Sequence, residues 1–176
     1  MSELQSPDIH HLNAAEGWLE LGNHHEALAE LERISAAEQG RLEVLGVRWS
    51  ITAQFKSWEE CVRIATSIVD LAPKEVFGWI HRSYALHELK RTQEARDLLL
   101  PAVKKFPKNE TIPYNLACYE CQLGEVDAAR DWLRRAMKLR HPAALKAQAL
   151  EDSDLQPLWP EIKVMPVAAK GSASSD

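Results

Sequence analysis

Small side chains recur along this chain at a fixed interval of 34 residues. They are Ala27, Cys61, Ala95 and Ala129. Two further sets of residues recur with the same period. Four residues downstream of the small residues lie Leu31, Ala65, Leu99 and Leu133, and seven residues downstream lie Ile34, Ile68, Ala102 and Ala136. Positions i, i+4 and i+7 lie on one face of a helix. A small residue once per period allows two helices to cross closely, so the pattern predicts a series of repeated helical units.

Polar segments lead into each of the four small residues and mark where a helix begins. They read GNHHEA, KSWEEC, KRTQEA and GEVDAA. Short polar segments between apolar periodic stretches are typical of turns. We therefore expect each unit to be a helix, a tight turn and a second helix.

This arrangement resembles the tetratricopeptide repeat (TPR), and the resemblance covers roughly residues 8–143. The fourth copy carries it best, through Leu116 and Ala117, the turn glycine Gly124 and the small residue Ala129. The resemblance implies an all-α fold: a right-handed α-α superhelix of four helix-turn-helix repeats, followed by a C-terminal capping helix.

Two residues conflict with a regular series of repeats. Trp49 occupies a position where the family has a small residue, and a side chain of that size is expected to push the helices of the second repeat apart. Pro101 lies within the helical stretch EARDLLLPAVKKF and removes a backbone hydrogen bond to Asp97. We therefore expect that helix to kink.

The sequence predicts a single TPR-like domain over residues 1–163. The expected repeats span residues 8–41, 42–75, 76–109 and 110–143, with the capping helix at 142–150 and a short turn at 152–162. This turn is expected to dock Leu155, Leu158 and Trp159 back on the last repeat. The remaining residues, 164–176, are expected to be disordered.

Charge and composition exclude several classes of protein. The net charge is −5 and the sequence has no basic stripe, which argues against a nucleic-acid partner. The first residues contain no apolar run, so we expect neither a secretory signal nor a membrane anchor. Three cysteines fit a reducing compartment better than a disulfide framework. These features favour a cytoplasmic protein.

The resemblance also implies a ligand-binding surface, because the first helices of successive repeats line a concave groove in the family. Helical spacing then assigns residues to that face. The candidates are Leu12, Glu16, Glu43, Ser50, Gln54, Phe77, Ile80, Tyr84, His87, Tyr114, Cys118 and Gln122. The face is mostly apolar and aromatic with acidic margins, which suits a peptide with apolar anchors and a basic flank. The alternative is that residues such as Leu12 and Ile80 pack between repeats.

One ligand known in the family does not suit this chain. Some members hold a C-terminal carboxylate with a clamp of Lys, Arg and Asn. The corresponding positions here are Leu12, Glu16, Val47, Phe77 and His81, or, one repeat later, Gly46, Ser50, His81, Thr111 and Asn115. Neither set contains a Lys or Arg to bind an anion, and Glu16 would repel one.

No set of residues in the sequence indicates catalysis. The spacing of Cys118 and Cys121 occurs in redox and metal sites, but here it lacks a second pair and fits side chains that fill the groove floor. The adjacent histidines of the pairs 10–11 and 24–25 point in different directions on a helix. Arg130, Arg134 and Arg135 fit a solvated helix face. We expect no enzyme activity, cofactor or metal.

Three functional hypotheses follow. The first is an adaptor or chaperone-like module that binds a peptide segment of another protein. A narrower version resembles the small helical-repeat chaperones of bacterial secretion systems in size and acidity. The second is a scaffold that associates with itself to form a homo-oligomer, and the third is a metal or redox site at Cys118 and Cys121.

Overall fold

The computed structural model describes residues 4–166 of the chain. All regular elements in this range are helical, which confirms the predicted fold class. Of the described residues, 4–90 form one compact unit and 91–166 form a second one. None of the described helices is long and apolar enough to cross a membrane.

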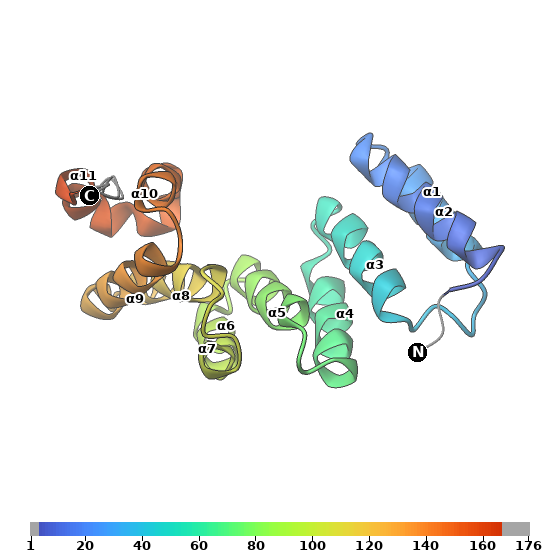
Figure 1. The fold of residues 1–176 in the computed structure, drawn as a ribbon, viewed down its shortest axis with the longest axis horizontal. Helices are drawn as coiled ribbons and strands as arrows, with labels where there is room; N and C mark the ends of the chain where they lie inside the picture. Colours follow the sequence, from blue (N-terminus) through green and yellow to red (C-terminus); the bar gives the residue numbers. More distant parts are fainter. Residues whose placement is uncertain (1–3, 167–176) are drawn as a thin grey trace, which may run out of the picture. The chain divides into compact units, whose positions relative to one another are not determined.

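The first unit contains five helices within residues 4–90 (Figure 1). They are α1 (Asp8–Glu20), α2 (His24–Arg33), α3 (Leu42–Gln54), α4 (Trp58–Leu71) and α5 (Val76–Glu88). Short turns connect α1 to α2 and α3 to α4, so each pair forms a helical hairpin. Helix α3 also contacts α1 and α2, and α4 packs on α5.

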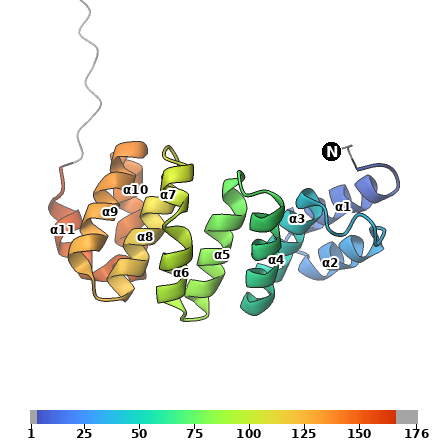
Figure 2. The same cartoon turned by 90° about the horizontal axis from the view of Figure 1, so that it is seen from below.

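The second unit is built around α8 and α9, which pack side by side (Figure 2). Its elements are α6 (Thr92–Leu99), α7 (Ala102–Lys105), α8 (Thr111–Gln122), α9 (Val126–Leu139), α10 (Pro142–Glu151), the 3₁₀-helix η1 (Ser153–Leu158) and α11 (Trp159–Val164). Pro101 lies between α6 and α7, where the regular α-helical hydrogen bonding is interrupted. Leu100 and Pro101 keep right-handed helical φ and ψ angles, so the interruption is local. The expected tail begins within α11, and residues 167–176 lie outside the described range.

The 34-residue period of the sequence is also a period of burial. All four small residues are fully buried: Ala27, Cys61, Ala95 and Ala129. The residues four positions downstream, Leu31, Ala65, Leu99 and Leu133, are fully buried as well. These two sets of residues therefore mark the buried face of α2, α4, α6 and α9, as the helical spacing predicted.

The same period appears in the backbone of the four turns. One residue in each turn has a positive φ: Gly22 at 75°, Lys56 at 54°, Lys90 at 62° and Gly124 at 84°. Each of these residues donates its backbone N–H to the carbonyl three positions earlier, at 2.8 to 3.1 Å. The turn thus requires a left-handed residue, which glycine provides without strain and lysine does not.

Trp49 is accommodated in the second repeat by small neighbours. Its side chain is 6% exposed and packs in a cluster that includes Cys61, Ala65 and Ala85. Both α3 and α4 remain continuous helices, but they contact each other less extensively than α1 and α2 do. The expected distortion of this repeat is therefore a looser helix pair rather than a broken helix.

Helices α4 and α5 approach each other closely at Gly78. A Cβ atom added to Gly78 would lie 2.9 Å from both the backbone nitrogen and Cγ2 of Val69. Real side chains do not tolerate such distances, so this crossing requires glycine. The close approach brings α5 onto α4 and fixes the position of Phe77, the residue before Gly78.

Candidate functional site

A groove of about 800 Å³ lies within the first unit. Its lining comes mainly from α1, α3 and the start of α5. The residues are Glu16, Leu19, Glu20, Leu42, Glu43, Gly46, Val47, Ser50, Ile68, Glu75 and Phe77. Ligand pockets in proteins commonly have volumes of about 300–1,000 Å³, so this groove is large enough for several side chains of a ligand.

The floor of the groove is apolar. Leu19 comes from α1, Val47 from α3 and Phe77 from α5. Val47 is 8% exposed, whereas Leu19 and Phe77 are half-buried and present part of their surface to solvent. An exposed apolar surface of this kind gains free energy when a ligand covers it.

The margin of the groove is acidic. Glu16, Glu20 and Glu75 are exposed, and their carboxylates form no hydrogen bond or ion pair with the rest of the described chain. Glu43 is different, because its Oε1 accepts a 2.7 Å hydrogen bond from Nε of Arg41. The lining therefore contains four carboxylates and no lysine or arginine.

The structure brings part of the predicted face together in this groove. Glu16, Glu43, Ser50 and Phe77 all line it. Leu12 does not, because it is 4% exposed and packs in the core of the first repeat, as the alternative interpretation expected. Gln54 is exposed outside the groove lining.

The predicted residues farther along α5 lie outside the groove lining. Ile80 is half-buried, Tyr84 is 39% exposed and His87 is 7% exposed. The Tyr84 ring packs edge-on against Trp58, with their centroids 5.6 Å apart. These side chains therefore contribute to packing within the unit, and Tyr84 retains an accessible part.

An aromatic cluster supports the floor of the groove from behind. The ring of His81 stacks on Phe77 with a centroid distance of 3.7 Å and meets Trp49 edge-on at 4.3 Å. Its Nδ1 lies 2.9 Å from the carbonyl oxygen of Phe77. Burial lowers the pKa of His81, and this hydrogen bond raises it by a smaller amount. A neutral His81 thus donates from Nδ1 and holds the Phe77 turn of α5 in place.

A segment of the same chain covers two of the three predicted residues of the second unit, Tyr114 and Cys118, and hydrogen-bonds the third, Gln122, which is exposed. The Tyr114 hydroxyl donates a 2.8 Å hydrogen bond to Oδ2 of Asp152, and Sγ of Cys118 lies 3.6 Å from the same oxygen. Gln122 donates from Nε2 to the carbonyl of Asp154 at 3.2 Å. Tyr114 and Cys118 are each 5% exposed.

The covering segment is the predicted turn at the C-terminal side of α10. Leu155 and Leu158 are fully buried, as expected, and Trp159 donates its indole N–H to the carbonyl of Ala149 at 3.0 Å. Arg130 of α9 binds Glu161 of α11 through two hydrogen bonds of 2.5 and 2.7 Å. Arg130 therefore anchors α11 and is not merely part of a solvated face.

The chemistry of the cysteine pair does not favour a reactive site. Burial, together with the nearby carboxylate of Asp152, raises the pKa of Cys118 well above its ordinary value. Burial and Asp154 raise the pKa of Cys121 to about 11. Both thiols are protonated at neutral pH, whereas nucleophilic attack requires the thiolate.

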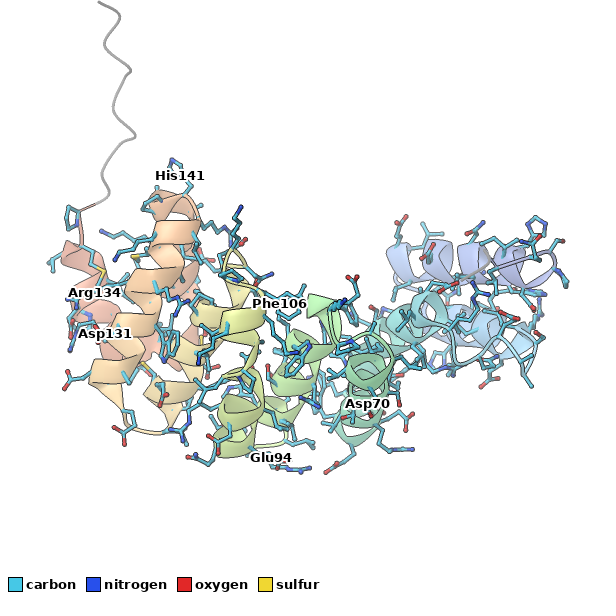
Figure 3. All side chains as sticks on the ribbon, turned by 60° about the horizontal axis from the view of Figure 1, so that its bottom comes forward. Asp70, Glu94, Phe106, Asp131, Arg134 and His141 are labelled. Atoms are coloured by element: carbon cyan, nitrogen blue, oxygen red, sulfur yellow. The ribbon has the colours of Figure 1, made fainter. Side chains whose placement is uncertain are left out.

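The remaining candidates are ordinary surface groups. Within residues 4–166 no group of three or more His, Cys, Asp or Glu side chains is placed to hold a metal ion. Arg134 pairs with Asp131 one turn away on the exposed side of α9, at 3.3 Å, and Figure 3 shows the two side chains together. His141 projects from the start of α10 in the same view.

Seven lining residues were not among the twelve predicted candidates: Leu19, Glu20, Leu42, Gly46, Val47, Ile68 and Glu75. Leu42 begins α3, Ile68 belongs to α4 and Glu75 precedes α5. The prediction considered only the exposed face of the first helix of each repeat. Residues at the junction between repeats also reach the groove, and the polar character of Glu75 immediately before an apolar helix was the available signal.

Comparison with known proteins identifies the fold but no sequence family. No protein-family model matches the chain, and no curated protein matches it. Residues 41 to the end of MamA from Desulfovibrio magneticus RS-1 superpose with a TM-score of 0.71 at 16% identity, covering 92% of this chain and 93% of that one. A thermophilic TPR protein of Thermus thermophilus superposes with a TM-score of 0.67 at 19% identity, covering 90% of this chain and 100% of that one.

These likenesses extend over nearly the whole chain. Since one of the matched structures is a TPR protein, the chain has a TPR-like helical-repeat fold, as its 34-residue period predicted. At this level of identity the comparison describes the fold and not the ligand.

Proposed function

We propose that this chain is a protein-interaction module and that its first unit binds a peptide segment of another protein in the groove between α1, α3 and α5. The observation that carries the proposal is the groove itself. It has an apolar floor, is open to solvent, and includes Glu16, Ser50 and Phe77 from the face that the repeat pattern assigns to ligands. An adaptor or chaperone-like role in the cytoplasm fits such a site.

The expected affinity follows from the size of the floor. Burying one large apolar side chain contributes about 1.5–3 kcal/mol, and the ordering of a flexible peptide opposes it. Two or three such anchors give dissociation constants of roughly micromolar to millimolar. A search for the ligand must therefore detect weak binding.

A displayed library of random peptides tests the proposal without knowledge of the natural partner. Peptides selected on the wild-type chain are measured against Gly46→Trp, which places a large ring in the groove. The control is Gly17→Trp in α1. Both glycines lie in helix interiors with no atom near an added Cβ, and only Gly46 lines the groove.

We expect the selected peptides to lose binding to Gly46→Trp and to keep it with Gly17→Trp. Equal binding to both folded variants would exclude the groove as the site. If the wild-type chain is a dimer and Gly46→Trp makes it a monomer, the occupant of the groove is a second copy of the chain, as in the scaffold hypothesis.

A further inference from the structure

The acidic margin of the groove carries an unbalanced charge. Glu16 and Glu20 lie four residues apart on α1 and both line the groove. Like charges at this spacing repel each other and destabilise a helix by a few tenths of a kcal/mol. Glu75 adds a third carboxylate from the start of α5, and none of the three has an intramolecular partner within residues 4–166.

The two arginines that adjoin lining residues in the sequence, Arg41 and Arg48, do not neutralise these charges. Arg48 donates from Nη2 to the side-chain oxygen of Gln39. Arg41 donates to Glu43 and also to Glu38, at 2.7 and 2.9 Å, so its guanidinium is already shared between two carboxylates. It does not line the groove. A ligand that enters the groove therefore meets an apolar surface with negative charge along its margin.

The second unit shows how a face of this repeat fold accepts a short peptide segment. The segment that covers α8 contains Asp152 and Asp154, and its leucines Leu155 and Leu158 are fully buried. The carboxylate of Asp152 in this segment accepts a hydrogen bond from the hydroxyl of Tyr114. An acidic, leucine-containing segment thus covers a face that supplies hydrogen-bond donors. The groove of the first unit instead has carboxylates, which are hydrogen-bond acceptors, along its margin.

We infer that the groove of the first unit selects a peptide segment in which an apolar side chain is flanked by Lys or Arg. This inference rests on the proposed function and names the class of its partner. The apolar side chain covers Leu19, Val47 and Phe77, and the cationic groups lie near the carboxylates of Glu16, Glu20 and Glu75. Opposite charge at the margin accelerates encounter and rejects acidic segments.

Unbiased peptide selection tests the charge of the partner directly. In peptides that bind the wild-type chain and are lost with Gly46→Trp, we expect Lys and Arg to be enriched over Asp and Glu. One such peptide is then measured at low and high salt. Its affinity should fall as salt rises, because exposed charges are screened.

A matched pair of triple variants separates the groove charges from the net charge of the chain. Glu16→Gln, Glu20→Gln and Glu75→Gln together should weaken the cationic peptide about tenfold at low salt. The control combines Glu32→Gln, Glu59→Gln and Asp70→Asn on α2 and α4, which removes the same charge away from the groove. The control should bind with nearly wild-type affinity.

The outcomes distinguish this inference from the proposed function. If the peptides that are lost with Gly46→Trp show no enrichment of Lys and Arg, or are enriched in Asp and Glu, the inference is overturned, and peptide binding in the groove still stands. Equal losses in the two triple variants would also overturn it, because net charge would then explain the effect. Peptides unaffected by Gly46→Trp would overturn the proposed site itself.

Discussion

The hydroxyl of Tyr114 in α8 donates a 2.8 Å hydrogen bond to the carboxylate of Asp152, which follows α10. This contact joins a helix face that sequence analysis assigned to ligand binding to a segment of the same chain. The chain itself therefore covers this face of α8, whereas the groove of the first unit is open.

Tyr114→Phe should destabilise the second unit. The hydrogen bond has a charged acceptor, for which the loss is about 1.5–3 kcal/mol, and Cys118 is a weaker donor to the same carboxylate. Urea denaturation measures the change. In a double-mutant cycle with Asp152→Asn, the two substitutions should be strongly non-additive, and simple additivity would mean that the contact contributes little.

Gly78→Ala should lower the free energy of unfolding by about 1–3 kcal/mol, since its Cβ would overlap the backbone of Val69. Gly46→Ala is the matched control. Its Cβ meets nothing within 4 Å, so the substitution should stabilise α3 by about 0.5–1 kcal/mol through helix propensity. The two alanines should thus shift the thermal midpoint in opposite directions. A stabilising Gly78→Ala would contradict the close approach of α4 and α5.

Lys56→Gly and Lys90→Gly should each stabilise the chain. Both lysines have a left-handed backbone at the position that glycine occupies in the first and fourth turns. Relief of that strain exceeds the entropy cost of the added glycine, for a net gain of about 0.5–1 kcal/mol. Gly22→Ala and Gly124→Ala should be destabilising in the same denaturation assay. If all four changes were neutral, the turns would not require a left-handed residue.

Acid should destabilise the first unit through His81. Its pKa in the folded chain lies below the ordinary value of 6.5, because burial opposes the charged form. Below about pH 6.5 the unfolded chain therefore binds a proton that the folded chain does not, and the free energy of unfolding falls as pH decreases. In His81→Gln this part of the pH dependence should disappear, whereas His141→Gln, which changes an exposed ring, should retain it. Denaturation across this pH range measures the difference.

The repeat period predicted the fold because burial and turn geometry both follow it. Ala27 and its three counterparts must be small where helices cross, and Gly22 and Gly124 must allow a left-handed turn. Such local requirements repeat with the structure and are visible in one sequence. Lys56 and Lys90 show the limit of the pattern. They have the same left-handed backbone conformation, but lysine at a position does not predict it as glycine does.

The candidate site was less predictable because accessibility depends on contacts between distant segments. Tyr114 and Cys118 have the helical positions of an open face, and only the placement of Asp152 shows that they are covered. Glu75 lies outside the helix face used for the assignment and still reaches the groove. Helical periodicity identifies which side chains share a face, whereas the packing of the intact chain decides which of them a ligand can contact.

Amide chemical-shift mapping with one selected peptide tests peptide binding in the groove most directly. We expect the largest perturbations around Leu19 in α1, Gly46 in α3 and Phe77 in α5, and we expect Gly46→Trp to abolish them. Perturbations concentrated on α2 and α4, with no change around Gly46, would contradict peptide binding in the groove.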